Sequence, residues 1–123
     1  MAAEGYHEPY EQLTADTRDM HRAIRSLMEE FEAVDWYQQR VDACHDDELR
    51  AILAHNRDEE KEHASMILEW IRRRDSVLDT QLKKYLFTTT SIVQKEEGSK
   101  GEPGGPAGSP PSIGSLRRAE GSK

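Results

Sequence analysis

The chain has 123 residues, a formal net charge of −7 at pH 7 and one cysteine, Cys44. A single cysteine excludes a disulfide within the chain. The acidic balance argues against a nucleic-acid partner and favours a cation as the small ligand. No stretch approaches the roughly 18 apolar residues of a membrane span, and the N-terminal part holds no apolar run typical of a secretory signal. We therefore expect a cytoplasmic protein with no membrane partner.

The sequence divides into three parts of different composition. Only residues 7–90 show sustained helical periodicity and look able to form a packed unit, so we expect one helical domain there. Residues 91–111 are rich in Pro, Gly and Ser and are predicted to be a flexible linker, and residues 112–123 form a separate tail. Such a small domain buries little apolar surface and usually needs disulfides, metal or oligomerisation.

The first predicted helix begins near Leu13 and spans about thirty residues, or about 45 Å. It ends around Cys44, where Asp46 or Asp47 can cap the next helix through its carboxylate. Its predicted apolar stripe has heptad-like spacing and consists of Leu13, Thr17, Met20, Ile24, Leu27, Phe31, Val34, Gln38 and Val41.

The opposite face of this helix carries charged residues around one tryptophan: Arg25, Glu29, Glu32, Trp36 and Arg40. One interpretation is a solvated face with ion pairs. The other is a further subunit interface anchored by Trp36, with Glu29 and Glu32 as weak cation sites.

A second long helix is predicted from about Glu48 to Arg74, and the short connection before it makes the two helices an antiparallel hairpin. A third, shorter amphipathic helix follows, with Val77, Leu78, Leu82, Tyr85, Leu86 and Phe87. The predicted fold class is therefore all-α.

The second helix places ionisable groups where its apolar stripe should run. At about 100° per residue, one face contains Leu49, Leu53, Asn56, Glu60, His63, Ile67 and Trp70. A Glu and a His three residues apart lie one turn apart on one side of a helix and can hold one cation together. An antiparallel first helix could bring Glu30 opposite them.

Two interpretations of this cluster remain open from the residues alone. The charged stretch around Glu60 can be a solvated helix face. Alternatively it is half of a metal site, because a carboxylate on a helix seam costs several kcal/mol unless a cation compensates it. Ferritin-like sites for two metals take twice these ligands from a four-helix bundle. We therefore hypothesise that two chains associate and each contributes Glu30, Glu60 and His63.

At these residues the sequence resembles the encapsulated ferritins, which are bacterial cargo proteins of encapsulin shells. The resemblance covers about residues 7–90 through the segments "HRAI", "MEEFEAVDWY", "ILAHNRDEEKEHA" and "KKYLF". It implies that a two-helix protomer dimerises into a ferritin-like four-helix bundle and that five dimers form a ring-shaped decamer.

The same resemblance implies roles for individual residues. Glu30, Glu60 and His63 correspond to the ferroxidase ligands, with Tyr37 close by. Glu29 and Glu32 correspond to glutamates on the path by which metal reaches the site, and Trp36 lies near that path. The terminal segment Ser112–Arg118, "SIGSLRR", resembles the short peptides that dock cargo on the inner wall of an encapsulin.

The function expected from these observations is oxidation of Fe²⁺ to Fe³⁺ by O₂ at a di-iron site between two subunits, for iron storage inside an encapsulin nanocompartment. The resemblance selects iron, because carboxylate and imidazole ligands also suit Mn or Zn. One alternative is a two-metal peroxidase or catalase on the same scaffold. Another is a non-enzymatic helical cargo or adaptor protein.

Overall fold

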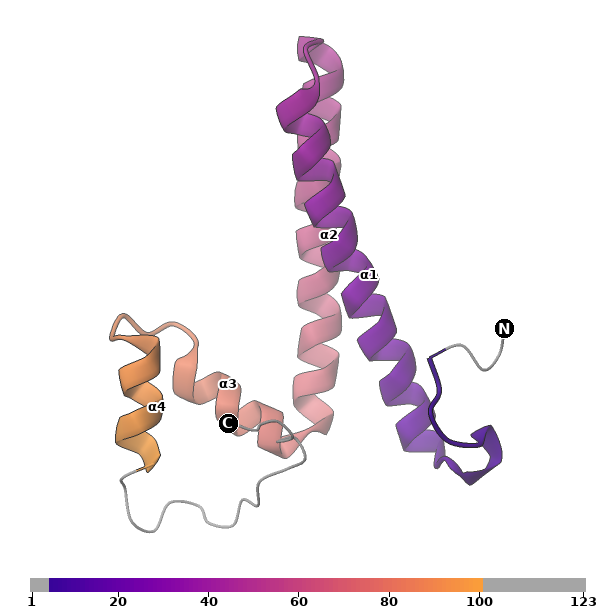
Figure 1. The fold of residues 1–123 in the computed structure, drawn as a ribbon, viewed down its shortest axis with the longest axis vertical. Helices are drawn as coiled ribbons and strands as arrows, with labels where there is room; N and C mark the ends of the chain where they lie inside the picture. Colours follow the sequence, from indigo (N-terminus) through magenta and orange to yellow (C-terminus); the bar gives the residue numbers. More distant parts are fainter. Residues whose placement is uncertain (1–4, 101–123) are drawn as a thin grey trace. The chain divides into compact units, whose positions relative to one another are not determined.

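The computed structural model describes residues 5–100, which contain helices and no strand. After a 3-10 turn at Tyr10–Gln12 come α1 (Ala15–Ala43), α2 (Asp47–Arg74), α3 (Ser76–Tyr85) and α4 (Ile92–Lys100) (Figure 1). The all-α class and the long two-helix hairpin are confirmed. The tail predicted at 112–123 and the linker beyond residue 100 lie outside the described residues. The described chain divides after Arg74 into two units.

Local hydrogen bonds explain where the hairpin turns. Thr14 caps α1, because its side chain accepts a bond of 3.0 Å from the backbone N–H of Thr17. At the other end of α1, the guanidinium of Arg50 donates two bonds to the carbonyl oxygen of Cys44, at 3.0 and 2.6 Å. Asp46 caps α2 by accepting from the N–H of Leu49 at 2.8 Å. Both helix ends at the turn are therefore satisfied by side chains.

The face of α2 that contacts α1 is rotated relative to the predicted stripe. Ala64 is 3% exposed and Ile71 4% exposed, whereas the predicted stripe residue Leu49 is 47% exposed. We take the contact face from the buried and half-buried residues that recur at spacings of three and four, which are Arg57, Glu60, Ala64, Ile67 and Ile71. The other predicted stripe residues are half-buried, so the prediction gave the contact side of α2 but not its most buried positions, because periodicity marks a broad apolar arc without locating its centre. His63 consequently lies at the edge of the interhelical contact.

The hairpin leaves a second apolar face uncovered. On α1, Ile24 and Phe31 belong to the predicted core stripe but are 45% and 55% exposed, and Met28 lies between them with similar exposure. These residues share one face of α1 because they are four and three positions apart. Ala64 and Ile71 are the buried hydrophobic residues of the described chain. Such a small core provides little stability for an isolated hairpin.

The second unit contains two short helices. Asp75 caps α3 by accepting from the N–H of Leu78 at 2.9 Å. The helix α4 lies inside the segment predicted as linker, so the prediction of irregular structure from residue 91 was wrong for 92–100. Ser91 accepts from the N–H of Gln94 at 3.3 Å, and Gln, Lys and Glu favour helix without an apolar stripe. Nowhere in residues 5–100 is a helix long and apolar enough to cross a bilayer.

We expect the thermal unfolding midpoint to rise with protein concentration. If other chains cover Phe31 and its neighbours on α1, folding is linked to association and follows mass action. Circular dichroism melts over about a hundredfold range of concentration measure this dependence. A midpoint that stays constant over that range would show that the hairpin is stable as a monomer.

Candidate metal centre

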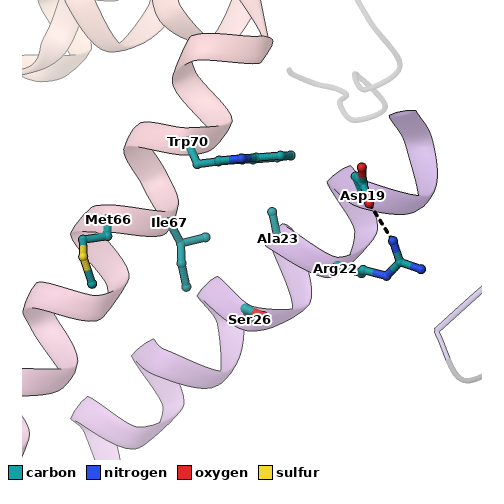
Figure 2. Close-up of a pocket in the computed structure, with 7 residues that line it drawn as sticks. All are labelled: Asp19, Arg22, Ala23, Ser26, Met66, Ile67 and Trp70. Atoms are coloured by element: carbon teal, nitrogen blue, oxygen red, sulfur yellow. Dashed lines mark hydrogen bonds and ion pairs between the residues drawn. The ribbon is translucent and has the colours of Figure 1, made fainter. Parts of the chain in front are cut away.

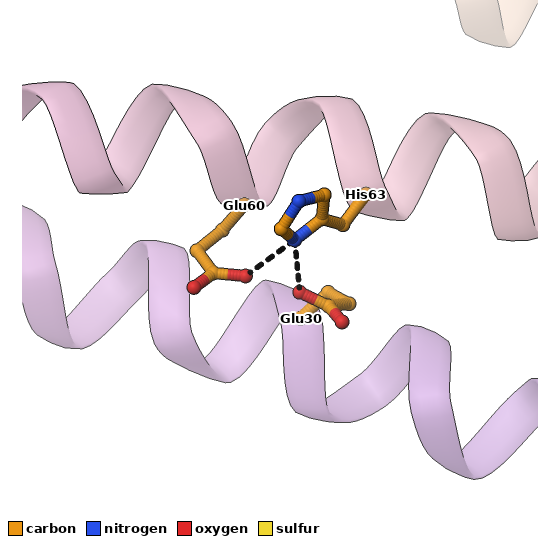
Figure 3. A group of neighbouring side chains, drawn as sticks. All are labelled: Glu30, Glu60 and His63. Carbon is orange, nitrogen blue, oxygen red and sulfur yellow. Dashed lines mark hydrogen bonds and ion pairs between the residues drawn. The ribbon is translucent and has the colours of Figure 1, made fainter.

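Three side chains from the two long helices meet at one point of the hairpin. Glu30 comes from α1, and Glu60 and His63 come from α2 (Figure 3). The Nδ1 atom of His63 lies 3.2 Å from Oε1 of Glu60 and 3.5 Å from Oε1 of Glu30. One ligand atom from each of the three residues can be chosen so that all lie within 4.8 Å of one another. This spacing lets a single cation contact all three.

The sequence places these groups together through simple helix geometry. Glu60 and His63 are three residues apart and therefore project from the same side of α2. Glu30 and His63 are almost equally far along the chain from the turn, so an antiparallel hairpin brings them face to face. Glu30 also lies on the contact face of α1, between the half-buried residues Leu27 and Val34.

The three groups change one another's protonation. A hydrogen bond between the two carboxyl groups raises the pKa of Glu30 above its ordinary value, and burial adds to this. The same bond lowers the pKa of Glu60. The hydrogen bond to Glu60, together with the negative charge of Glu30, raises the pKa of His63. Two acidic groups and one imidazole at this separation thus compete for protons, as expected where a cation can replace them.

The donor set fits a hard or borderline divalent ion. Two carboxylates and one imidazole suit Fe, Mn or Zn, and three ligands leave positions for water, substrate or further protein ligands. The side chain of His63 is 43% exposed, whereas those of Glu30 and Glu60 are about half as exposed. The cluster therefore opens at the edge of the hairpin, on the side where His63 lies.

The other residues predicted at the site lie outside this cluster. Tyr37 is two turns from Glu30 along α1, and its ring is 5.3 Å from the guanidinium carbon of Arg40. Glu29 and Glu32 are exposed on α1 and do not belong to the group of three ligands found in the described residues. Trp36 is 50% exposed. In the protomer, their assignment to the chemistry or to metal access stays a prediction.

A groove that the sequence did not predict lies between the two helices away from the turn. It has a volume of about 510 Å³ and is lined by Asp19, Arg22, Ala23, Ser26, Met66, Ile67 and Trp70 (Figure 2). Its lining is mainly apolar, and Asp19 and Arg22 pair with each other at 2.6 Å. Small residues on α1 opposite Trp70 produce this space.

A polar network on the turn side of the cluster was also missed. Nη1 of Arg57 donates to Oε1 of Gln38 at 3.0 Å and so joins α2 to α1. Nε of Arg57 donates to Asp58 at 3.0 Å, and this bond lowers the pKa of Asp58. Sequence periodicity did not reveal this bond, because it depends on the register of the two helices, which the turn sets.

The fold and the cluster define the protein as a helical hairpin with a carboxylate–histidine group whose spacing suits a metal ion. A model of the EncFtn-like family matches residues 5–89. The chain belongs to this family.

Named relatives agree with this assignment. An encapsulated ferritin-like protein from Rhodospirillum rubrum is 59% identical over 102 residues, covering 78% of this chain and 73% of the relative. A ferritin-like protein from Thermotoga maritima is 52% identical, covering 80% of this chain and 87% of the relative. The encapsulin nanocompartment cargo protein EncC from Myxococcus xanthus is 32% identical over 92% of this chain and 95% of its own length.

A solved structure shows the same fold. The crystal structure of protein ne0167 from Nitrosomonas europaea has a TM-score of 0.70 and 68% sequence identity with this chain. The match covers 72% of this chain and 97% of the crystallised one.

We expect the affinity of the cluster for Co²⁺ or Zn²⁺ to fall as pH falls. The raised pKa of His63 means that a proton competes with metal at a higher pH than it would for a free imidazole. Below that pKa, each proton displaced should weaken binding about tenfold per pH unit. Calorimetric titration from about pH 8 to about pH 5.5, in buffers of different ionisation enthalpy, measures affinity and proton release. Affinity independent of pH would exclude His63 as a ligand.

Proposed function

We propose that this protein is a ferroxidase that oxidises Fe²⁺ with O₂. Fe²⁺ is the substrate, each ion gives one electron to O₂, and Fe³⁺ leaves for storage. The observation that carries the proposal is the convergence of Glu30, Glu60 and His63, with ligand atoms within 4.8 Å. Hard carboxylate oxygens suit both oxidation states of iron, and His63 adds a borderline nitrogen ligand.

Membership of the family supports iron as the metal, because the ligands alone would bind Zn more tightly than Fe²⁺. The chain's own residues then have distinct tasks. Glu30 and Glu60 provide negative charge to hold the substrate. His63 must lose its proton before Nδ1 can coordinate. The raised pKa of Glu30 means that protons compete with metal at this carboxylate too, so binding at low pH releases protons.

Two chains complete the site in this proposal. One protomer supplies three ligating side chains, which is half of the set that a ferritin-like site for two metals requires. The exposed edge at His63 and the uncovered face containing Phe31 support association at the site. A four-helix bundle of two hairpins would bury apolar surface and double the ligands at once. A ring of five such dimers is the corresponding proposal for the full assembly.

The proposed partner of this protein, besides further copies of itself, is an encapsulin shell. The R. rubrum relative is named as encapsulated, and the M. xanthus relative is named as an encapsulin cargo protein. We propose that this chain is also carried inside such a shell in the cytoplasm and docks through Ser112–Arg118. In that segment Ile113 and Leu116 would fill apolar pockets, and Arg117 and Arg118 would meet acidic groups.

Replacing Glu60 or His63 by Ala should abolish rapid Fe²⁺ oxidation without loss of helix. Loss of a residue that only supports a metal ligand costs up to about 100-fold in activity. Loss of a ligand itself should therefore reduce the initial rate by more than that. Oxygen uptake after Fe²⁺ addition measures the rate, and peroxide consumption tests the peroxidase alternative. Glu59→Ala is the control, because Glu59 pairs with His55 at 3.7 Å outside the cluster. Wild-type rates in Glu60→Ala would contradict the assignment.

Removing residues 112–123 should leave Fe²⁺ oxidation unchanged and prevent loading into a shell. The catalytic groups lie on α1 and α2, whereas docking is assigned to the tail. Co-purification with a co-expressed encapsulin measures loading. Ile113→Asp with Leu116→Asp should reproduce the effect without shortening the chain, since it removes the apolar contacts. Normal loading of the truncated chain would place docking in the helical domain.

A further inference from the structure

Four side chains form a continuous hydrogen-bonded network across the hairpin beside the metal cluster. Gln38 on α1 donates from Nε2 to Oδ1 of Asp42 at 3.0 Å. Its Oε1 accepts from Nη1 of Arg57 on α2 at 3.0 Å. Arg57 in turn donates from Nε to Oδ1 of Asp58 at 3.0 Å. The two ends of the Gln38 amide are thus used by different partners, which fixes its orientation.

The network is placed where it can control the ligands. Arg57 precedes Glu60 by one turn on the contact face of α2, and its side chain is 19% exposed. Gln38 follows Glu30 by about 12 Å along α1. The contacts of Glu30 with the cluster and of Gln38 with Arg57 both join α1 to α2.

Apolar packing close to the ligands consists of Ala64, which follows His63 and is 3% exposed, and of half-buried residues such as Val34 and Leu53. The buried residues Ala64 and Ile71 both lie on the other side of the cluster from Arg57. On the turn side, no residue of the described hairpin is buried. The spacing and rotation of the helices at Glu30 therefore depend on the polar contact between Gln38 and Arg57 as well as on the turn.

We propose that Arg57 and Gln38 are positioning residues for the cluster of Glu30, Glu60 and His63. Their bond holds α1 against α2 at the separation where Glu30 reaches Glu60 and His63. Neither residue belongs to the cluster, so they act through helix placement. The inference rests on the proposed metal site, because it assigns a cause to the geometry of that site.

A simple surface ion pair would not have these features. The bond between Arg57 and Asp58 stays within α2, and Asp58 is largely exposed, so that pair alone would add little. The bond to Gln38 is also at an exposed position, but it crosses the hairpin from α2 to α1 and its donor is charged. The side chain of Arg57 is 19% exposed, so most of its apolar stem is covered.

The test measures Co²⁺ binding to the full-length protein by calorimetry and by the visible absorption of the bound ion, which reports coordination geometry. Arg57→Met keeps the apolar stem and removes the bond, and Gln38→Leu removes it from the other side. Each should weaken Co²⁺ binding about tenfold and change the spectrum, as supporting residues of metal ligands do. The double variant should lose no more Co²⁺ affinity than either single variant, because both substitutions remove the same hydrogen bond. Arg57→Lys, which retains the charge and one donor, should recover part of the affinity.

Gln39→Leu is the matched control. Gln39 donates to Asp35 at 3.1 Å, the same chemistry at the neighbouring position of α1 without reaching α2. Its Co²⁺ affinity and spectrum should match the wild type. Circular dichroism must show equal helix content in all variants. If Arg57→Met loses helix, Gln38→Leu decides the question, since it removes no charge.

The possible outcomes separate this inference from the metal site itself. Wild-type binding in both Arg57→Met and Gln38→Leu would overturn the positioning role and leave the site intact. An equal loss in Gln39→Leu would also overturn it, because the effect would then be general to α1. If the wild-type protein binds no Co²⁺, or Glu60→Ala binds it as well as wild type does, the metal site is wrong and the inference fails with it.

Discussion

The mutual approach of Glu30, Glu60 and His63 is the constraint around which the hairpin is organised. Two carboxylates facing each other are repulsive unless a proton or a cation lies between them. In the protomer the hydrogen bond to Glu60 and this repulsion raise the pKa of Glu30, and the two carboxylates raise the pKa of the neighbouring imidazole of His63. A divalent cation would compensate the repulsion more strongly than a proton, because its charge is larger and its bonds reach all three groups. A bound cation would therefore reduce the electrostatic repulsion between the two carboxylates further than the protein's own groups do.

The small core and the exposed cluster both favour association with a second hairpin. Ala64 and Ile71 are the buried hydrophobic residues of the described chain, whereas Ile24, Met28 and Phe31 face outward. His63 is at the edge of the interhelical contact and not at its centre. A second hairpin placed on this side would cover apolar surface and bring further ligands. Because partner and metal would bind the same arrangement, each would favour the other by mass action.

Much of the hairpin could be predicted because its signals are local. Asp46 caps α2 as one of the two predicted aspartates, and the spacing of Glu60 and His63 fixes their common side. The centre of the contact face could not be located, because a broad apolar arc also contains residues that face away from α1. The helix α4 was missed since it has no apolar stripe. The bond between Gln38 and Arg57 depends on hairpin register, which helix periodicity alone does not give.

The register of α1 against α2 determines which side chains of the two helices meet. The guanidinium of Arg50 on the carbonyl of Cys44 fixes the turn, and the turn sets which residues of α1 and α2 stand opposite each other. The bond between Gln38 and Arg57 comes next along the hairpin, and the contact between Glu30 and His63 follows it. Each link is weak alone, since an ordinary hydrogen bond contributes about 1 kcal/mol. Because these contacts follow one another along the hairpin, a change of register at the turn would also displace Glu30 relative to Glu60 and His63. In the proposal made above, the site is positioned by a succession of polar contacts that begins at the turn, together with the packing of Ala64 beside His63.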